Sequence, residues 1–324
     1  MLSVIATVFN EGDNIDHLMQ SLVRQTRKPD EVVIVDGGST DDTVSRMTTY
    51  QNQLSLEISV QAGANISQGR NLAMQQASGD ILAITDAGVR LPDTWLEDLT
   101  RPFAENPQTT ISCGFFRADP HTLFEVALGA TTLPLEREID PQTFLPSSRS
   151  VAVKRSAALE VGGYPEWLDY CEDLVFDFRL KATQPSFAFA PKACVEFRPR
   201  PNLTAFWKQY YRYARGDGKA NLWFKRHLIR YGIYGVGLPL LLIGGLAIHP
   251  LVWGLLLIGG IAYCWTPFRR LPAVMQRSPQ RDALAWVQVA LLIPVIRVVG
   301  DMAKMVGYPV GRWWRWQHRA MGWW

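Results

Sequence analysis

The chain has 324 residues, enough for two domains, and its formal net charge of +3 hides an uneven distribution. Basic residues dominate residues 198–230, where Asp217 is the only acidic residue, and residues 231–266 contain no charged side chain. Four cysteines occur without a Cys-x-x-Cys pair, which argues against a structural zinc site or a disulfide framework and favours a reducing cytoplasm. Residues 1–9 are apolar but lack the length and basic leader of a signal peptide, so we interpret them as part of the first strand.

The first third of the chain alternates short apolar runs with amphipathic segments. Residues 32–35 are β-branched without polar alternation, which predicts a strand buried on both faces of a parallel sheet. In the helix before it, Ile15, Leu18 and Leu22 fall on one face. The expected strands are 3–8, 32–35, 58–60 and 81–85, and the expected helices between them lie at about 15–22, 43–50 and 70–77.

Three of these strands end in polar side chains. They lead into Asn10-Glu11, Asp36 and Asp86, respectively. If the crossovers are right-handed, the strands lie parallel and present these groups at one sheet edge, where open α/β sheets bind ligands. Asp36 alone would be equally well explained as an exposed residue in an ordinary strand–turn–helix corner. The recurrence of the pattern favours a ligand site.

The segments that follow are less regular. A helix after Pro92 turns Trp95 and Leu99 towards the sheet, and strands are expected at 111–116 and 150–154 with a helical segment near 122–131 between them. This arrangement predicts a mixed second half that carries the other substrate.

Three short motifs together resemble those of family-2 glycosyltransferases with the GT-A fold. They are residues 36–42 (Asp-Gly-Gly-Ser-Thr-Asp-Asp), residues 69–71 (Gly-Arg-Asn) leading to Asp86, and Glu172-Asp173 ahead of an apolar helix. The resemblance covers residues 2–218. It implies an α/β fold with a Rossmann-like, mixed and mostly parallel sheet and flanking helices, followed by an α-helical membrane-anchoring region.

The expected domains follow from the same resemblance. A catalytic domain occupies residues 1–226, with a nucleotide-sugar half at about 1–105 and an acceptor half at about 106–226. A membrane region occupies residues 227–324.

The resemblance also assigns the donor site. It implies that Thr7, Glu11 and Asp36 contact the base of a nucleoside-diphosphate sugar and that Asp86 lies near its ribose and diphosphate. Arg70 is also expected among the residues that bind the nucleotide sugar. Carboxylates at strand ends can accept the hydrogen bonds that bases and riboses offer.

The metal motif of that family is incomplete here. Its usual Asp-x-Asp reads Asp86-Ala87-Gly88, so the second carboxylate is missing. Mg²⁺ or Mn²⁺ is normally held by few carboxylates together with substrate phosphates, which leaves a divalent cofactor open, with Asp86 as its candidate ligand. The alternative is that Gly88 merely turns the chain.

Glu172 and Asp173 are the candidate catalytic residues. By resemblance, Asp173 is the general base that deprotonates the acceptor hydroxyl. The positive end of a helix dipole lowers the pKa of a carboxyl and weakens it as a base, unless burial near Trp167 or Tyr170 offsets this effect. Taken alone, two acidic residues in the first turn of a helix are better explained by capping.

Other segments are assigned to the acceptor or to the leaving group. Residues 209–213 resemble the Gln-x-x-Arg-Trp motif of processive members, with Tyr213 in the Trp position, so no polymerisation is inferred. Arg212 is expected to meet the charge of the departing diphosphate. The alternative is a basic helix lying on anionic lipid. The loop 146–149 and the turn 162–167 (Gly-Gly-Tyr-Pro-Glu-Trp) are expected to lie near the acceptor.

The apolar stretch 231–266 predicts a helical hairpin, because one span needs only about 20 residues and His249-Pro250 lies near its middle. Both flanks are basic, which by the positive-inside rule places them and the catalytic domain on the cytoplasmic face of the inner membrane. The basic residues are Lys225, Arg226 and Arg230 before the hairpin and Arg269, Arg270, Arg277 and Arg281 after it.

A third apolar segment, at about 283–306, contains Pro294 and Arg297. A central Arg costs roughly 2.5–3.5 kcal/mol on insertion scales, which favours a tilted or interfacial helix over a third span without excluding the span. The aromatic and basic tail, 311–316 with Trp323-Trp324, is expected to anchor at the lipid headgroups.

These observations predict a membrane-anchored inverting glycosyltransferase acting on a lipid-linked or membrane-proximal glycan acceptor. The alternative, motivated by the missing carboxylate, is a non-catalytic nucleotide-sugar-binding scaffold of a membrane glycan-assembly complex. Nucleic-acid binding by the aromatic and basic residues 206–224 is not expected, because this stretch leads directly into the apolar hairpin.

Overall fold

The computed structural model describes residues 1–184 and 187–319. The chain divides into two compact units: the first comprises Met1–Arg117 and Leu135–Arg198, and the second comprises Ala118–Pro134 and Pro199–Trp324. The division thus falls at Arg198, earlier than the expected domain boundary at residue 226. The functional assignment of residues 1–226 to catalysis remains a prediction.

The described residues of the first unit form a mixed sheet of eight strands in the order β3-β2-β1-β4-β7-β6-β8-β5. The strands are β1 (Leu2–Val8), β2 (Glu31–Asp36), β3 (Leu56–Val60), β4 (Ile81–Ile84), β5 (Val89–Arg90), β6 (Ile111–Ala118), β7 (Val151–Lys154) and β8 (Phe187–Phe197). As predicted, the neighbouring pairs among β1 to β4 are parallel. The strand β7 is antiparallel to both β4 and β6. The fold is therefore the expected mixed, mostly parallel α/β sheet with flanking helices.

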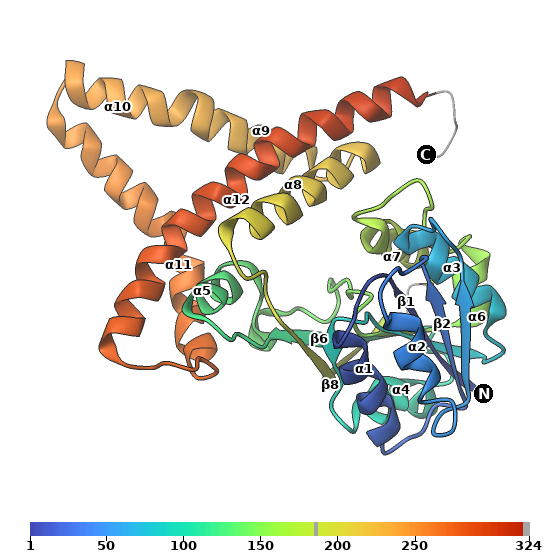
Figure 1. Cartoon of the computed structure of the whole chain (residues 1–324). Helices are drawn as coiled ribbons and strands as arrows, with labels where there is room; N and C mark the ends of the chain where they lie inside the picture. Colours follow the sequence, from blue (N-terminus) through green and yellow to red (C-terminus); the bar gives the residue numbers. More distant parts are fainter. Residues whose placement is uncertain (185–186, 320–324) are drawn as a thin grey trace. The chain divides into compact units, whose positions relative to one another are not determined.

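The helices of this unit cover both faces of the sheet (Figure 1). They are α1 (Asn14–Arg24), α2 (Thr43–Thr48), α3 (Ile66–Gln76), α4 (Trp95–Glu105), α6 (Arg155–Glu160) and α7 (Glu172–Thr183). Val32 and Ile34 of β2 pack in the layer that contains residues of α1 and α4, whereas Val33 and Val35 pack in the layer that contains residues of α3, α6 and α7. The prediction that this strand is buried on both faces is confirmed.

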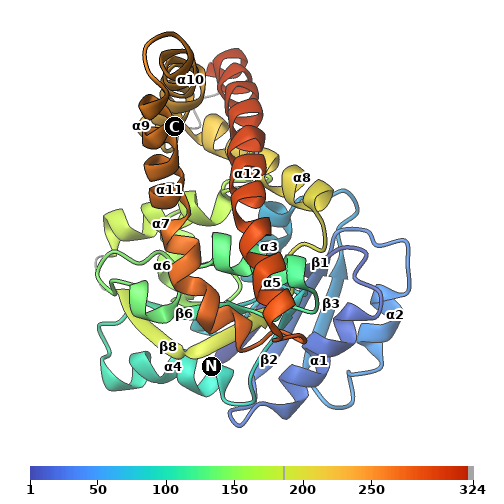
Figure 2. The same cartoon turned by 90° about the vertical axis from the view of Figure 1, so that its left-hand side faces the viewer.

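The second unit is helical. Its helices are α5 (Leu123–Thr132), α8 (Leu203–Ala220), α9 (Phe224–Gly232), α10 (Leu238–Ala247), α11 (Trp253–Met275) and α12 (Ala283–Gln317). The expected hairpin is present, with its turn at Pro250–Val252, and α11 and α12 pack together with α5 around a shared apolar core (Figure 2). The helix α5 therefore belongs to this core, although the chain on both sides of it belongs to the first unit.

Three helical segments within residues 1–184 and 187–319 are long and apolar enough to cross a membrane: Phe224–Ala247, Pro250–Met275 and Ala283–Gln317. The third has the highest mean hydropathy of the three, 2.0. By length and composition this helix is able to span a membrane, and its predicted tilted or interfacial placement stays a prediction. The tail residues Trp323-Trp324 lie outside the described residues, and their role as an anchor stays a prediction.

Glycines allow α8 and α12 to approach closely. A Cβ atom on Gly307 would lie 2.2 Å from the carbonyl oxygen of Tyr211, and one on Gly311 would lie 2.0 Å from that of Arg215. Real Cβ atoms do not approach backbone atoms so closely, so these positions need glycine for the two helices to pack as they do. The segment 209–213, which resembles the Gln-x-x-Arg-Trp motif, lies in this helix–helix contact.

A polar cluster connects the apolar helices of the second unit. The Asp301 carboxylate of α12 accepts hydrogen bonds from Arg230 Nε (2.8 Å), Tyr263 OH (2.6 Å) and Tyr234 OH (3.3 Å). Lys304 Nζ lies 3.8 Å from the same carboxylate. An ionised group among apolar helices is expensive unless it is paired, and here it is paired from three helical segments.

Candidate active site

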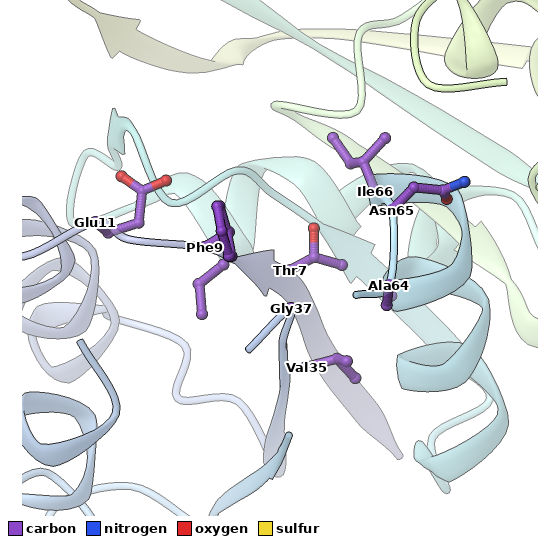
Figure 3. A pocket seen from close by; sticks show the side chains of 10 residues that line it. Thr7, Phe9, Glu11, Val35, Gly37, Ala64, Asn65 and Ile66 are labelled. Carbon is purple, nitrogen blue, oxygen red and sulfur yellow. The ribbon is translucent and has the colours of Figure 1, made fainter. Parts of the chain in front are cut away.

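A pocket of about 180 Å³ opens at the carboxyl ends of β1 and β2 (Figure 3). Thr7 and Glu11, two of the predicted base contacts, line it from β1 and the following loop, while Asn65 and Ile66 line it from the start of α3. The remaining lining residues are Val8, Phe9, Val35, Gly37, Ala64 and Gly69. The floor is tight, because a Cβ on Gly69 would lie 2.7 Å from the Thr7 methyl carbon.

Asp36 ends β2 as predicted, but its side chain is fully buried. Its Oδ1 accepts hydrogen bonds from the backbone N–H groups of Gly38 (2.8 Å) and Ser39 (2.7 Å), and its Oδ2 accepts one from the Ser39 hydroxyl (2.5 Å). The carboxylate therefore shapes the turn whose Gly37 lines the pocket. Its contact with a base remains a prediction, and it would require this turn to open.

Arg70 joins the donor-side carboxylate to the acidic pair. Its NH2 donates to Asp86 Oδ1 at 2.7 Å, and its NH1 donates to Glu172 Oε1 at 2.8 Å. The Arg70 side chain is only 2% exposed and lies over the Tyr164 ring at 5.0 Å. A buried guanidinium held in this way fixes the two carboxylates relative to each other. These contacts suit a positioning role for Arg70, and its predicted role in nucleotide-sugar binding stays a prediction.

Burial determines the protonation of the acidic residues on α7. Burial, together with the charge of Asp173, raises the pKa of Glu172, although Arg70 opposes this effect. Burial also raises the pKa of Asp173, and it raises that of Asp177 one turn later. The lowering expected from the helix N-terminus is thus outweighed. Asp86 differs, because the charges of Arg70 and Arg149 overcome burial and lower its pKa.

Hydrogen bonds with Asn71 stabilise the turn at residues 162–167, which precedes α7. The Asn71 side chain donates to the Tyr164 carbonyl and the Glu166 carboxylate (2.9 Å each) and accepts from the Tyr164 N–H (2.8 Å). Gly163, at φ +67°, lies against this amide, and a Cβ there would be 2.4 Å from Asn71 Oδ1. The turn ends at Cys171, which has a left-handed backbone with φ 64° and directs the chain into Glu172. Such backbone strain in a non-glycine residue is typical of functional sites.

Arg149 is the residue of the site that the sequence placed only loosely, near the acceptor. Its Nε lies 3.7 Å from Asp86 Oδ2, its NH1 donates to Ser147 Oγ at 3.0 Å, and its guanidinium lies over the Phe197 ring at 4.6 Å. The backbone of this loop is held by Thr85, whose hydroxyl donates to the Arg149 carbonyl at 3.0 Å. No local sequence motif predicts these contacts, because they join segments that lie far apart in the chain.

The carboxylate donor set for a divalent ion is small. Asp86 contributes one carboxylate, and its two oxygens face Arg70 and Arg149. Within the residues that the structure describes, no group of three or more His, Cys, Asp or Glu side chains gathers to hold a metal. These residues do not fit an ion held by the protein alone. Any ion at Asp86 would depend on substrate phosphates and would compete with two guanidinium groups.

The predicted site residues are brought together only in part. Asp86, Arg70 and Glu172 form one hydrogen-bonded group in the first unit, Asp173 follows Glu172 on α7, and the Thr7–Glu11 pocket adjoins the group through Gly69 of α3. Arg212 lies on α8 in the second unit. Its participation in the same site remains a prediction.

Comparison with known proteins gives matches to part of the chain. Residues 3–156 match the sequence profile of Glycosyl transferase family 2. The uncharacterized glycosyltransferase YibD of Escherichia coli (strain K12) is 33% identical over 113 residues, which cover 35% of this chain and 33% of YibD. The match therefore spans about a third of the length of that relative.

Solved structures show the same fold over nearly the whole chain. The mannosyltransferase PcManGT from Pyrobaculum calidifontis, in complex with GDP-Man and Mn²⁺, aligns with a TM-score of 0.57 and 18% identity over 97% of this chain and 87% of that one. Staphylococcus aureus TarS 1–349, in complex with UDP-GlcNAc, aligns with a TM-score of 0.53 and 18% identity over 99% of this chain and 92% of that one. Residues 3–156 are thus similar to Glycosyl transferase family 2, the chain shares the GT-A fold of the aligned structures, and the helices that follow are apolar enough to span a membrane.

Proposed function

We propose that the protein is an inverting glycosyltransferase that moves a sugar from a nucleoside-diphosphate donor to an acceptor hydroxyl. The observation that carries the proposal is the Arg70 bridge, which joins Asp86 on the donor side to Glu172 beside the candidate base. This bridge starts from the helix whose Gly69 lines the pocket. A pocket of about 180 Å³, the carboxylate proposed for the donor and the base proposed for the acceptor thus lie in one unit.

In this proposal Asp173 is the general base. The acceptor oxygen attacks the anomeric carbon from the face opposite the leaving group and its proton passes to the Asp173 carboxylate. The bond from the anomeric carbon to the phosphate oxygen breaks with its electron pair, and the nucleoside diphosphate departs. The raised pKa of Asp173 suits this role, because a base works best when its pKa approaches the operating pH.

The pocket at the ends of β1 and β2 is proposed as the site of the base, with Thr7 and Glu11 as its polar contacts. GDP-Man and UDP-GlcNAc, which the aligned structures contain, are the first donors to examine. The turn formed around Asp36 is proposed to support this pocket through Gly37.

We further propose that the apolar helices anchor the protein in the inner membrane, with the catalytic unit on the cytoplasmic face. The three candidate spans and the basic flanks of the hairpin support this arrangement. An anchored enzyme meets lipid-linked or membrane-proximal glycans at high local concentration, so the proposed acceptor is of this kind. Arg212 is proposed to assist the departing diphosphate.

The test is turnover of a panel of UDP-, GDP- and dTDP-sugars by the detergent-solubilised full chain, followed as nucleoside diphosphate release. Asp173→Asn is expected to lower turnover by about 10²–10⁴-fold with donor binding retained. Asp93→Asn is the matched control, since it removes an exposed carboxylate paired with Arg24. Turnover that is equal in Asp173→Asn and wild type would contradict the proposal.

A non-catalytic scaffold is the second candidate, and one observation favours it. The second carboxylate of the metal motif is absent, because Gly88 stands in its place. A scaffold would bind a sugar nucleotide, seen as a shift in melting temperature, without ever releasing a nucleoside diphosphate. Release by wild type with loss in Asp173→Asn excludes it.

A further inference from the structure

Two guanidinium groups face Asp86, but only one of them is accessible to a ligand. Arg70 is 2% exposed and is occupied by Asp86 and Glu172, so a ligand does not reach it. Arg149 is 25% exposed, and its Nε lies 3.7 Å from Asp86 Oδ2. A ligand that reaches Asp86 would therefore meet the positive charge of Arg149.

The position of Arg149 is fixed by contacts on several sides. The ring of Phe197 lies under its guanidinium, and Ser147 accepts a hydrogen bond from it. The neighbouring Ser148 shares a 2.8 Å hydrogen bond with Tyr164 OH, so the loop is joined to the ring that also lies beside Arg70. A weakly hydrated, pre-oriented guanidinium is well suited to bind phosphate oxygens.

Gly88 occupies the position of the second carboxylate in the metal motif, and a side chain would fit there. Gly88 is exposed, and a Cβ built on it meets no atom within 4 Å. The glycine is therefore not required by packing. The absence of a carboxylate here and the presence of a cation at Asp86 are two independent features that reduce the affinity of the site for a divalent ion.

We propose that Arg149 takes the place of a divalent cation at the donor diphosphate, so that donor binding and transfer proceed without metal. This inference rests on the proposed glycosyltransferase function. As the bond between sugar and phosphate breaks, its electron pair moves onto the phosphate oxygen, and the guanidinium of Arg149 donates hydrogen bonds to the oxygens that gain charge. The proton of the acceptor goes to Asp173, and no further reactant is needed.

The first experiment measures donor binding and turnover by the EDTA-stripped full chain, with and without MnCl₂, over the panel of UDP-, GDP- and dTDP-sugars. Wild type is expected to bind one donor with a Kd that changes less than twofold between EDTA and Mn²⁺. In EDTA, Arg149→Ala is expected to weaken that binding about 10–100-fold and to lower turnover about 10²–10³-fold, with partial recovery in Arg149→Lys.

Arg101→Ala is the matched control for lost positive charge, because Arg101 is an exposed residue of α4 that pairs with Asp98. Its donor affinity is expected to equal that of wild type. Circular dichroism and melting temperature verify that each variant is folded. Should Arg149→Ala fold poorly, Arg149→Lys and Arg149→Gln provide the same comparison.

The second experiment needs no turnover. Mn²⁺ binding is measured by electron paramagnetic resonance for wild type, Gly88→Asp, and Gly88→Asp combined with Arg149→Ala. The combined variant restores the second carboxylate and removes the competing cation, so it is expected to bind Mn²⁺ at least tenfold more tightly than wild type. Equal Mn²⁺ binding by wild type and this variant would contradict the proposal.

The outcomes separate this inference from the proposed function. Donor binding that requires Mn²⁺ in wild type overturns the role of Arg149 and leaves the glycosyltransferase proposal standing. Donor binding in EDTA that Arg149→Ala leaves unchanged does the same. The absence of binding and turnover for every donor, with and without Mn²⁺, overturns both.

Discussion

Arg70 and Glu172, 102 residues apart in the sequence, are joined by a buried hydrogen bond of 2.8 Å. The same guanidinium holds Asp86, so one side chain aligns a carboxylate at the end of β4 with another at the start of α7. Contacts of this kind explain how a site is assembled from weak, separate motifs.

Replacement of Arg70 by Met is expected to lower the free energy of unfolding by about 3–5 kcal/mol, because the buried Glu172 and the half-buried Asp86 lose the guanidinium that they share. Combining Arg70→Met with Glu172→Gln should cost less than the sum of the single changes, since the double variant leaves one buried charge fewer unpaired. Urea denaturation followed by tryptophan fluorescence measures this cycle. Strict additivity would show that the pair does not interact.

Asp177 gives a prediction about pH. Its buried carboxyl has an oxygen, Oδ2, without a hydrogen-bond partner, and burial with the nearby charges of Asp173 and Glu172 raises its pKa well above the ordinary value. A raised pKa means that the folded state keeps a proton that the unfolded chain has lost. Stability contributed by this group is therefore full below about pH 4 and declines as the pH rises towards the folded pKa.

Asp177→Asn removes this ionisation without a change of shape. The variant and wild type are expected to be equally stable near pH 4, and the variant is expected to be more stable by at least about 1 kcal/mol at pH 8. Denaturation curves at both pH values give the difference. A gain of the same size at the two pH values would mean that ionisation of Asp177 plays no part.

The close contact between α8 and α12 predicts an unusual response to alanine. Gly311→Ala forces a Cβ against the Arg215 carbonyl and is expected to cost about 1–3 kcal/mol. Gly259→Ala is the matched control, because Gly259 lies in the interior of α11 with no atom within 4 Å of its added Cβ. This control is expected to be neutral or stabilising by up to about 1 kcal/mol. Melting temperatures of the full chain in detergent distinguish them, and equal shifts would contradict the packing argument.

Asp301 provides the test of the polar cluster. Asp301→Asn leaves Arg230 and Lys304 near each other without their shared anion, and is expected to destabilise the second unit by about 3 kcal/mol. Asp282→Asn removes the same charge, but Asn remains a good cap for the start of α12, so it should change stability by only a few tenths of a kcal/mol. Thermal unfolding in detergent measures both. Equal melting temperatures of the two variants would show that the polar cluster does not contribute to stability.

Local patterns were sufficient for much of the fold. The strand at 32–35 was predicted because its side chains enter both core layers, so every position had to be apolar. The strand β8 was not predicted, because Pro191 interrupts an alternation that is already weak. The placement of α5 in the helical unit was also missed, since its apolar partners lie on α11 and α12, far along the chain.

For the site, the sequence identified which side chains carry charge but not what they contact. Asp86 and the acidic pair were predicted from motifs, and the structure joins them. The sequence does not indicate that Arg149 lies beside Asp86, because this contact, at 3.7 Å, joins segments that are far apart in the chain. Asp36 illustrates the opposite case: a carboxylate at a strand end looks available for a ligand until the turn after it folds back and uses its oxygens.

The shared core of α5, α11 and α12 has a practical consequence for anyone who shortens the gene to obtain a water-soluble enzyme. Removal of everything beyond residue 226 would delete α11 and α12 but retain α5, whose Val126, Leu128 and Ala130 would lose their cover. Because α5 interrupts the catalytic fold in sequence, it cannot be trimmed from an end. Such a fragment would expose the apolar side chains of α5 and aggregate. Loss of activity in this fragment would therefore not show that the enzyme needs the membrane.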